Sequence, residues 1–318
     1  MTDSTSNPLV HLGFEQMLVW AREQGLVTGG PGERRLAAMR LDVLAGGALR
    51  HAAAEDVLLT EQWAAFICWV DDHIDRGNLA RSAGSLEAFT AQLRQALDPV
   101  ADRSEAPTPV ASVLAGLWER TAEGMPARWR ERFTREYVDF LDATEQEVAL
   151  RDAGTRLSLA QYVQLRRRTI TVLPMLTVLE RTGHAVMVED PLVDAGVRSL
   201  RWALADISGW ANDLASGSDD ALAGQDNLVA VIAREEGCST ALARGRARSM
   251  IDQRCRDFAS QAQALRTTHV PSGHTKQLSR YVDLVERFMS ATLHWLSTTG
   301  RFTVGPDTSA AARTPTAW

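Results

Sequence analysis

Apolar residues recur along most of the chain at the three- and four-residue spacing of one face of a helix. Ala, Leu, Arg and Glu are abundant in these stretches, and the alternating pattern of a half-buried strand is rare. The pattern therefore predicts an all-α fold. The expected helices, with ends defined to about three residues, cover 9–25, 34–53, 58–76, 85–97, 108–123, 127–151, 158–183, 190–218, 224–236, 239–266 and 271–300.

No long break divides the predicted helices into two self-sufficient halves. With 318 residues and 45% apolar content, the chain can bury one large core. We expect a single helical domain over 1–302 and a mobile tail over 303–318, where Thr, Ala and Pro are frequent and large apolar side chains are few. The Gly-rich stretch at 29–32 lacks the Gly-Lys-Ser/Thr ending of a phosphate-binding loop, so we expect a plain turn there.

Charge and cysteine content exclude several classes of protein. A net charge of −6 argues against a nucleic-acid or anionic-membrane partner. No apolar run approaches the roughly 20 residues of a membrane span, and the first residues do not resemble a signal peptide. The three cysteines, Cys68, Cys238 and Cys255, show no CxxC spacing, which predicts reduced thiols in a cytoplasmic protein.

Two acidic clusters, about 140 residues apart, end two largely apolar predicted helices. In the first, Asp71 and Asp75 lie one helical turn apart and share a face, whereas Asp72 points about 100° away. In the second, Asn212, Ser216 and Asp220 follow at intervals of four and form one row of oxygen-bearing side chains.

Either cluster could be no more than the solvated end of a core helix. Buried carboxylates are costly without partners, and acidic side chains at a helix C-terminus are disfavoured by the helix dipole. Both arguments favour a metal partner. Oxygen ligands of this kind suit Mg²⁺, which commonly completes its coordination with substrate phosphates. The pattern therefore indicates metal-assisted handling of a diphosphate.

The two motifs together resemble the class I terpene synthases of bacterial type. The run Asp71-Asp72-His73-Ile74-Asp75 matches the DDxxD motif of that family. The second cluster matches its NDxxSxxxE metal triad, with Asp220 in the final place where Glu is commoner. The resemblance extends from about residue 15 to 302 and implies a helical bundle around a deep apolar pocket.

Further positions match the same family. Arg166 lies 46 residues before Asn212, as does the arginine that senses the diphosphate. Arg301 and Phe302 stand where the family has an Arg-Tyr pair, so the usual tyrosine hydroxyl is missing. Trp295 matches a tryptophan that precedes this pair.

Two departures from the family pattern affect the diphosphate end. Asp219 replaces a frequent lysine, which weakens the positively charged clamp. In that family the helix that carries the sensing arginine usually breaks at a glycine. In this chain Ile170 and Thr171 stand in the corresponding neighbourhood. The second departure leaves the residue that assists ionisation unassigned.

The resemblance implies a Mg²⁺-dependent cyclase that ionises a linear isoprenyl diphosphate, cyclises the carbocation and releases diphosphate. Asp71, Arg166 and Arg301 would be the catalytic residues, and the two arginines would also bind the diphosphate. Three Mg²⁺ ions would be held by Asp71, Asp75, Asn212, Ser216 and Asp220. The remaining substrate-binding residues would be Ala64, Ile67, Cys68, Ile170 and Trp295.

Several alternatives stay open at this stage. A chain-elongating isoprenyl diphosphate synthase would carry two DDxxD motifs, and a helical binding protein that has lost activity would explain the departures from the family. Farnesyl diphosphate (C15) is the commonest substrate of such bacterial enzymes, but the modest bulk near Ile67 and an aromatic content of 6% also fit geranylgeranyl diphosphate (C20). We expect a monomer or a homodimer.

Overall fold

A computed structural model describes residues 10–76, 79, 83–98, 107–187, 190–223, 225–270 and 272–302. Within these residues the regular structure is helical and contains no strand, which confirms the predicted all-α fold. The predicted tail at 303–318 lies outside the described residues. None of the described helices has the length and apolar character needed to cross a membrane.

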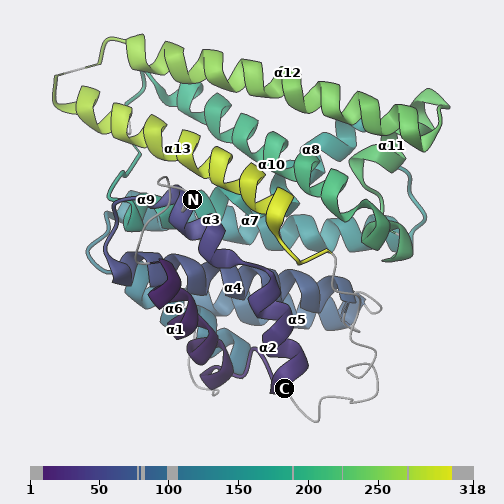
Figure 1. Cartoon of the computed structure of the whole chain (residues 1–318), viewed down its shortest axis with the longest axis horizontal. Coiled ribbons are helices and arrows are strands. Elements are labelled where there is room, and N and C mark those ends of the chain that lie inside the picture. Colours follow the sequence, from purple (N-terminus) through teal and green to yellow (C-terminus); the bar gives the residue numbers. More distant parts are fainter. Residues whose placement is uncertain are drawn as a thin grey trace.

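Thirteen helices are described, and Figure 1 shows their arrangement. Their bounds are α1 Val10–Glu23, α2 Gly29–Ala38, α3 Leu41–Ala48, α4 Ala54–Arg76, α5 Ala83–Leu97, α6 Pro109–Ala122, α7 Ala127–Asp152, α8 Leu159–Thr169, α9 Val172–Thr182, α10 Asp194–Ala223, α11 Leu228–Glu236, α12 Thr240–Thr267 and α13 Ser272–Thr298.

The helices that carry the two acidic clusters lie inside the bundle. Helix α4 packs against α1, α3, α6 and α9, and α10 packs against α8, α12 and α13. The short helix α9 contacts α4, α7, α10 and α13, so it joins the two groups (Figure 1). The ends of α4 and α10 therefore lie around one interior space.

Helix α4 is buried because its side chains are apolar on nearly every face. Trp63, Phe66, Val70 and Ile74 are at most 2% exposed. The Trp63 ring meets the Phe133 ring of α7 edge to face, with centroids 5.2 Å apart. This packing fixes the helix whose last turns carry Asp71 and Asp72.

A buried ionic network ties four helices together. Glu180 of α9 is fully buried and binds Arg132 of α7 and Arg201 of α10. Arg201 also donates hydrogen bonds to Glu136 of α7 and to the Tyr281 hydroxyl of α13. Because the charges satisfy one another inside the core, the network fixes the relative positions of these helices.

The predicted helix over 34–53 is wrong, because the chain forms two helices there. Arg40 between α2 and α3 has a left-handed backbone, with φ +52°, and its guanidinium binds the buried carboxylate of Asp42. The predicted turn at 29–32 is also wrong, since α2 begins at Gly29. Pro31 falls in the first turn of α2, where a missing N–H is tolerated.

The predicted helix over 158–183 is likewise two helices, α8 and α9. The break is at Thr171, a β-branched residue with φ +60°. Pro174 explains it: in a continuous helix its ring would clash with the Ile170 carbonyl, and it has no N–H to bond that oxygen. Thr171 donates its hydroxyl to the Ile170 carbonyl instead, at 2.6 Å.

Candidate active site

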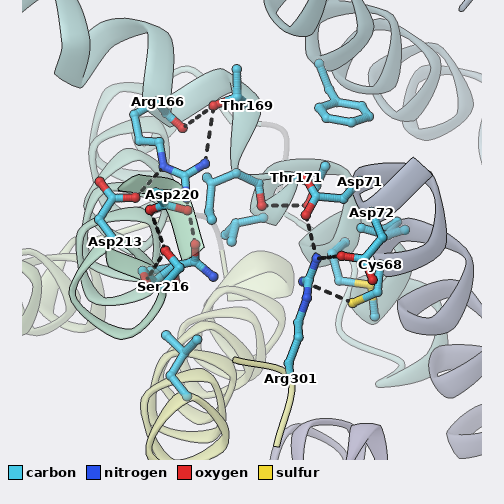
Figure 2. A pocket seen from close by; sticks show the side chains of 18 of the residues that line it. Cys68, Asp71, Asp72, Arg166, Thr169, Thr171, Asp213, Ser216, Asp220 and Arg301 are labelled. Carbon is cyan, nitrogen blue, oxygen red and sulfur yellow. Dashed lines mark hydrogen bonds and ion pairs between the residues drawn. The ribbon is translucent and has the colours of Figure 1, made fainter. Parts of the chain in front are cut away.

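A cavity of about 610 Å³ lies between α4, α7, α8, α9, α10 and α13 (Figure 2). Its charged lining comes mainly from the C-terminal turns of α4, α7 and α10. Its apolar lining comes from earlier turns of the same helices and from α9 and α13. The predicted lining residues Ala64, Ile67, Cys68, Ile170 and Trp295 all line this cavity.

One wall of the charged end is the row Asn212, Ser216 and Asp220 on α10, as the spacing predicted. The Ser216 hydroxyl lies 2.7 Å from Asp220 Oδ2 and 3.0 Å from the Asn212 carbonyl oxygen. Asn227 Nδ2 donates to the same Asp220 oxygen at 3.2 Å. Burial raises the pKa of Asp220, although the hydrogen bonds that its carboxylate accepts from Ser216 and Asn227 oppose the shift. The Asp219 side chain lies outside the described part of the chain.

Arg166 joins α8 to this wall. Its Nε donates to Asp213 at 2.9 Å (Figure 2). Its Nη2 donates to Asn212 Oδ1 at 2.8 Å. The approach is close because residue 209 is a glycine: a Cβ there would lie 3.3 Å from Arg166 Cγ. The neighbouring arginines, Arg167 and Arg168, pair with carboxylates outside the cavity.

Asp213 was not among the predicted site residues, yet it holds the arginine in place. Its carboxylate accepts hydrogen bonds from Arg166, from the Tyr162 hydroxyl at 2.6 Å and from the Leu228 amide at 3.0 Å. Tyr162 stands one turn before Arg166 and so shares its face of α8. The four-residue spacing of Tyr162 and Arg166 was therefore a signal in the sequence that both side chains could bind the same carboxylate.

The opposite wall is formed by the end of α4. Arg301 Nη2 lies 2.5 Å from Asp71 and 3.2 Å from Asp72, and Arg301 Nη1 lies 3.4 Å from the Cys68 sulfur (Figure 2). Arg35 of α2 also binds Asp72, at 3.0 Å. Burial raises the pKa of the Cys68 thiol to about 11, so it stays protonated. The Asp75 side chain lies outside the described residues.

Glu147 and Phe302 complete the rim of the cavity. Glu147 lies on α7 and also escaped the sequence analysis, although its spacing from Phe140 and Thr144 puts the three on one helical face. Burial raises the pKa of Glu147 to about 7. The centroid of the Phe302 ring lies 5.8 Å from the Arg301 guanidinium carbon, so the ring makes a cation–π contact with Arg301.

Residues 62–257 match the family model described as terpene synthase family 2, C-terminal metal binding. The match spans more than half of the chain and includes both acidic clusters. The chain belongs to the terpene synthase family. It is therefore an enzyme that depends on a divalent metal.

Characterised relatives are similar over most of this terpene synthase. Pristinol synthase of Streptomyces pristinaespiralis is 28% identical over 305 residues, which is 93% of this chain and 82% of the relative. A (−)-β-caryophyllene synthase of Saccharothrix espanaensis, described as cyclising (2E,6E)-farnesyl diphosphate, is 28% identical over 76% of this chain and 68% of its own. The structure of wild-type cucumene synthase has a TM-score of 0.80 at 25% identity, covering 92% of this chain and 97% of its own.

The donor set of the charged end fits a hard divalent cation. No group of three or more His, Cys, Asp or Glu side chains able to hold a metal occurs within the described residues. The available ligands are instead Asp71 on one wall and the Asn212, Ser216 and Asp220 row on the other, and all offer oxygen. Oxygen donors suit Mg²⁺ rather than Zn²⁺, and Mg²⁺ accepts few protein ligands when substrate phosphates supply the rest.

Proposed function

We propose that this terpene synthase ionises farnesyl diphosphate and cyclises the carbocation to a sesquiterpene, releasing diphosphate. One observation carries the proposal: two oxygen-bearing walls and two arginines surround one end of a cavity, and the rest of its lining is mainly apolar. An anionic leaving group fits the first part and a hydrocarbon chain fits the second.

At the charged end, Asp71 and Asp75 would hold Mg²⁺ from one side and the row Asn212, Ser216 and Asp220 from the other, with three ions in all. The metal supplies Lewis-acid stabilisation of the negative charge on the leaving diphosphate. Arg166 and Arg301 bind the diphosphate oxygens and add fixed positive charge where negative charge develops.

The groups around the arginines hold them ready for this task. Arg166 is oriented by Asp213 and Asn212, so its guanidinium needs little rearrangement before the diphosphate binds. Arg301 rests on Asp71 and Asp72 and can exchange part of these contacts for phosphate oxygens. The break at Thr171 brings Ile170 and Thr171 into the cavity lining beside Arg166.

The apolar part of the cavity folds the isoprenoid chain and excludes water from the cation. The aromatic rings of Phe140, Phe288 and Trp295 line it and can stabilise a carbocation through their faces. The Trp295 ring is fixed because its Nε1 donates to the Met39 carbonyl at 2.6 Å. A strong base in this part would remove a proton too early, and the lining described here has none.

Chain elongation is the less favoured reading. Its second metal site would be a second DDxxD motif, whereas α10 carries the Asn212, Ser216 and Asp220 row. A degenerate site is also disfavoured, because that row keeps its hydrogen bonds although Asp220 is shorter than the usual Glu. The C15 substrate is supported by the relative that cyclises farnesyl diphosphate.

Product analysis tests the proposal. Purified protein is incubated with Mg²⁺ and the C10, C15 or C20 diphosphate separately, with and without isopentenyl diphosphate, and the products are identified by gas chromatography and mass spectrometry. We expect a cyclic C15 product without isopentenyl diphosphate. A longer prenyl diphosphate formed only with isopentenyl diphosphate would show an elongating enzyme, and a cyclic C20 product would correct the chain length.

A further inference from the structure

The break between α2 and α3 leaves two backbone carbonyls for another part of the chain. In a continuous helix, Ala38 and Met39 would accept the amides of the residues four positions later. The left-handed backbone of Arg40 ends that series, and the Val43 amide binds the Arg40 carbonyl at 3.0 Å. The Ala38 and Met39 carbonyls therefore need partners from outside the two helices.

The C-terminal end of α13 supplies these partners. Gly300 donates its amide to the Ala38 carbonyl at 2.8 Å. The Met39 carbonyl accepts two hydrogen bonds, from Trp295 Nε1 at 2.6 Å and from the Thr299 hydroxyl at 2.8 Å. We call this set of three hydrogen bonds the α2–α13 junction. Trp295, Thr299 and Met39 are all buried, so little water competes for the junction.

The closeness of the junction requires a glycine at residue 300. A Cβ there would lie 2.9 Å from the Ala38 oxygen and 3.2 Å from the Ala38 Cβ, so a larger residue would have to shift the chain. The next residue is Arg301, whose amide donates to the Thr299 hydroxyl at 3.2 Å. Because Thr299 in turn donates to the Met39 carbonyl, the junction also fixes the backbone of Arg301.

The same turn of α2 reaches the acidic motif through Arg35. Its Nε and Nη2 donate to Asp72 Oδ2 at 3.2 Å and 3.0 Å. The other Asp72 oxygen accepts from Arg301, which also binds Asp71 (Figure 2). The side chains of Arg35 and Asp72 are 20% and 19% exposed, so solvent screens their attraction only in part. Two arginines therefore share the Asp72 carboxylate.

We propose that the last turn of α2 positions Arg301 for the diphosphate, with Arg35 as a positioning residue. Arg301 has to give up part of its contact with Asp71 and Asp72 before it can bind phosphate oxygens. Arg35 stays on Asp72 during this exchange, so the carboxylate holds Arg301 less firmly. The junction keeps the backbone of Arg301 in place while the side chain turns. This inference rests on the proposed function and names residues that serve its diphosphate site.

Binding of inorganic diphosphate in the presence of Mg²⁺, measured by isothermal titration calorimetry, tests the role of Arg35. In Arg35→Gln, Asp72 keeps its charge but loses one cation, so it retains Arg301 more strongly. We expect the dissociation constant for diphosphate to rise about tenfold. Arg35→Lys keeps the charge and should recover most of the affinity. Arg34→Gln is the matched control, because Arg34 is exposed on the same helix, and should bind like the wild type.

Gly300→Ala tests the junction independently. The added methyl group would push residues 299–301 away from the Ala38 carbonyl, and we expect diphosphate binding to weaken about tenfold, as for one lost hydrogen bond. The ratio of the terpene products should change as well, because Trp295 lines the apolar part of the cavity. Gly245→Ala in α12 is the control, since a Cβ there meets nothing within 4 Å, and it should change neither quantity.

The outcomes separate this inference from the function on which it rests. Wild-type diphosphate affinity in Arg35→Gln, or equally weak binding by Arg35→Lys and Arg35→Gln, would overturn the role of the Arg35 charge. Wild-type affinity with unchanged products in Gly300→Ala would overturn the role of the junction. Calorimetry needs no turnover, so a wild-type protein that binds diphosphate but forms no terpene would overturn the proposed function alone.

The melting temperature of each variant checks that it folds. Arg35→Gln removes one partly exposed ion pair, which contributes little to stability, so we expect a melting temperature near that of the wild type. The Arg35 variants therefore decide the proposal if Gly300→Ala unfolds.

Discussion

At the scale of single residues, the side chains of the charged end are held by one another before any ligand arrives. Asp213 orients Arg166, and Ser216 binds Asp220. Such preorganisation matters because groups already aimed at the developing charge need no rearrangement during the reaction. The spacing within each cluster could be predicted from the sequence, since helical periodicity alone puts Asn212 and Ser216 in one row.

Replacing Asn212 with Ala should remove one metal ligand and one acceptor of Arg166. We expect kcat/KM for farnesyl diphosphate to fall at least about 100-fold, while the melting temperature changes little because the side chain lies at the cavity. Asp220→Glu is the matched control, which keeps the carboxylate and should retain activity. Equal activity of wild type and Asn212→Ala in steady-state kinetics would remove the row from the site.

Replacing Thr171 with Gly tests the strain at the break between α8 and α9. A β-branched residue held at φ +60° lowers the free energy of unfolding by about 1–3 kcal/mol through backbone strain. Glycine has no such strain, but its greater freedom in the unfolded chain costs up to about 1 kcal/mol of stability. We therefore expect Thr171→Gly to unfold at the same or a higher denaturant concentration than wild type.

The same change in an ordinary helix should behave differently. Ala259 is exposed in the middle of α12 and has a normal helical backbone, so Ala259→Gly should lose about 1 kcal/mol. If Thr171→Gly destabilises the protein as much as Ala259→Gly does, the left-handed conformation of Thr171 stores no strain.

At the scale of helices, the sequence predicted most elements but missed two breaks. The break at Thr171 had a visible signal, because Pro174 cannot continue a helix that includes Ile170. The break at Arg40 had no such signal, because it depends on an ion pair with a buried carboxylate. The contacts of Arg301 with Asp71 and Cys68 join residues about 230 apart, and helical periodicity says nothing about such distances.

The network around Glu180 should be the most sensitive point between the helices. Glu180→Ala leaves Arg132 and Arg201 buried without their shared counter-charge, and we expect a loss of about 3–5 kcal/mol in the free energy of unfolding. The control is Asp283→Ala, which removes a half-exposed partner of Arg266 and should cost less than about 1 kcal/mol. Similar denaturant midpoints for the two variants would contradict the structural role of the network.

At the scale of the whole molecule, stability should depend on one buried acid that does not line the cavity. Glu61 of α4 is fully buried against α1, and neither carboxylate oxygen has a hydrogen-bond partner among the described residues. Burial, reinforced by the charge of Asp42, raises the pKa of Glu61 to about 8. The unfolded chain loses this proton near pH 4.5 while the folded chain keeps it, so folding becomes less favourable as the pH rises between these two values.

Glu61→Gln should remove this pH dependence. We expect the variant to gain stability over wild type as the pH rises from 5 to 8, by up to about 4 kcal/mol. Glu15 is exposed on α1, so Glu15→Gln should show no such trend. Thermal unfolding at several pH values measures both differences. A constant difference between wild type and Glu61→Gln would mean that Glu61 is ionised in the folded protein.

The central claim is that two oxygen-bearing walls bind metal and diphosphate together. The most direct measurement is the release of inorganic diphosphate from farnesyl diphosphate by the purified protein, with Mg²⁺ and after its removal by a chelator. We predict release with Mg²⁺, none after chelation and full recovery when Mg²⁺ is restored. Release that continues without a divalent metal, or no release in its presence, would contradict the account.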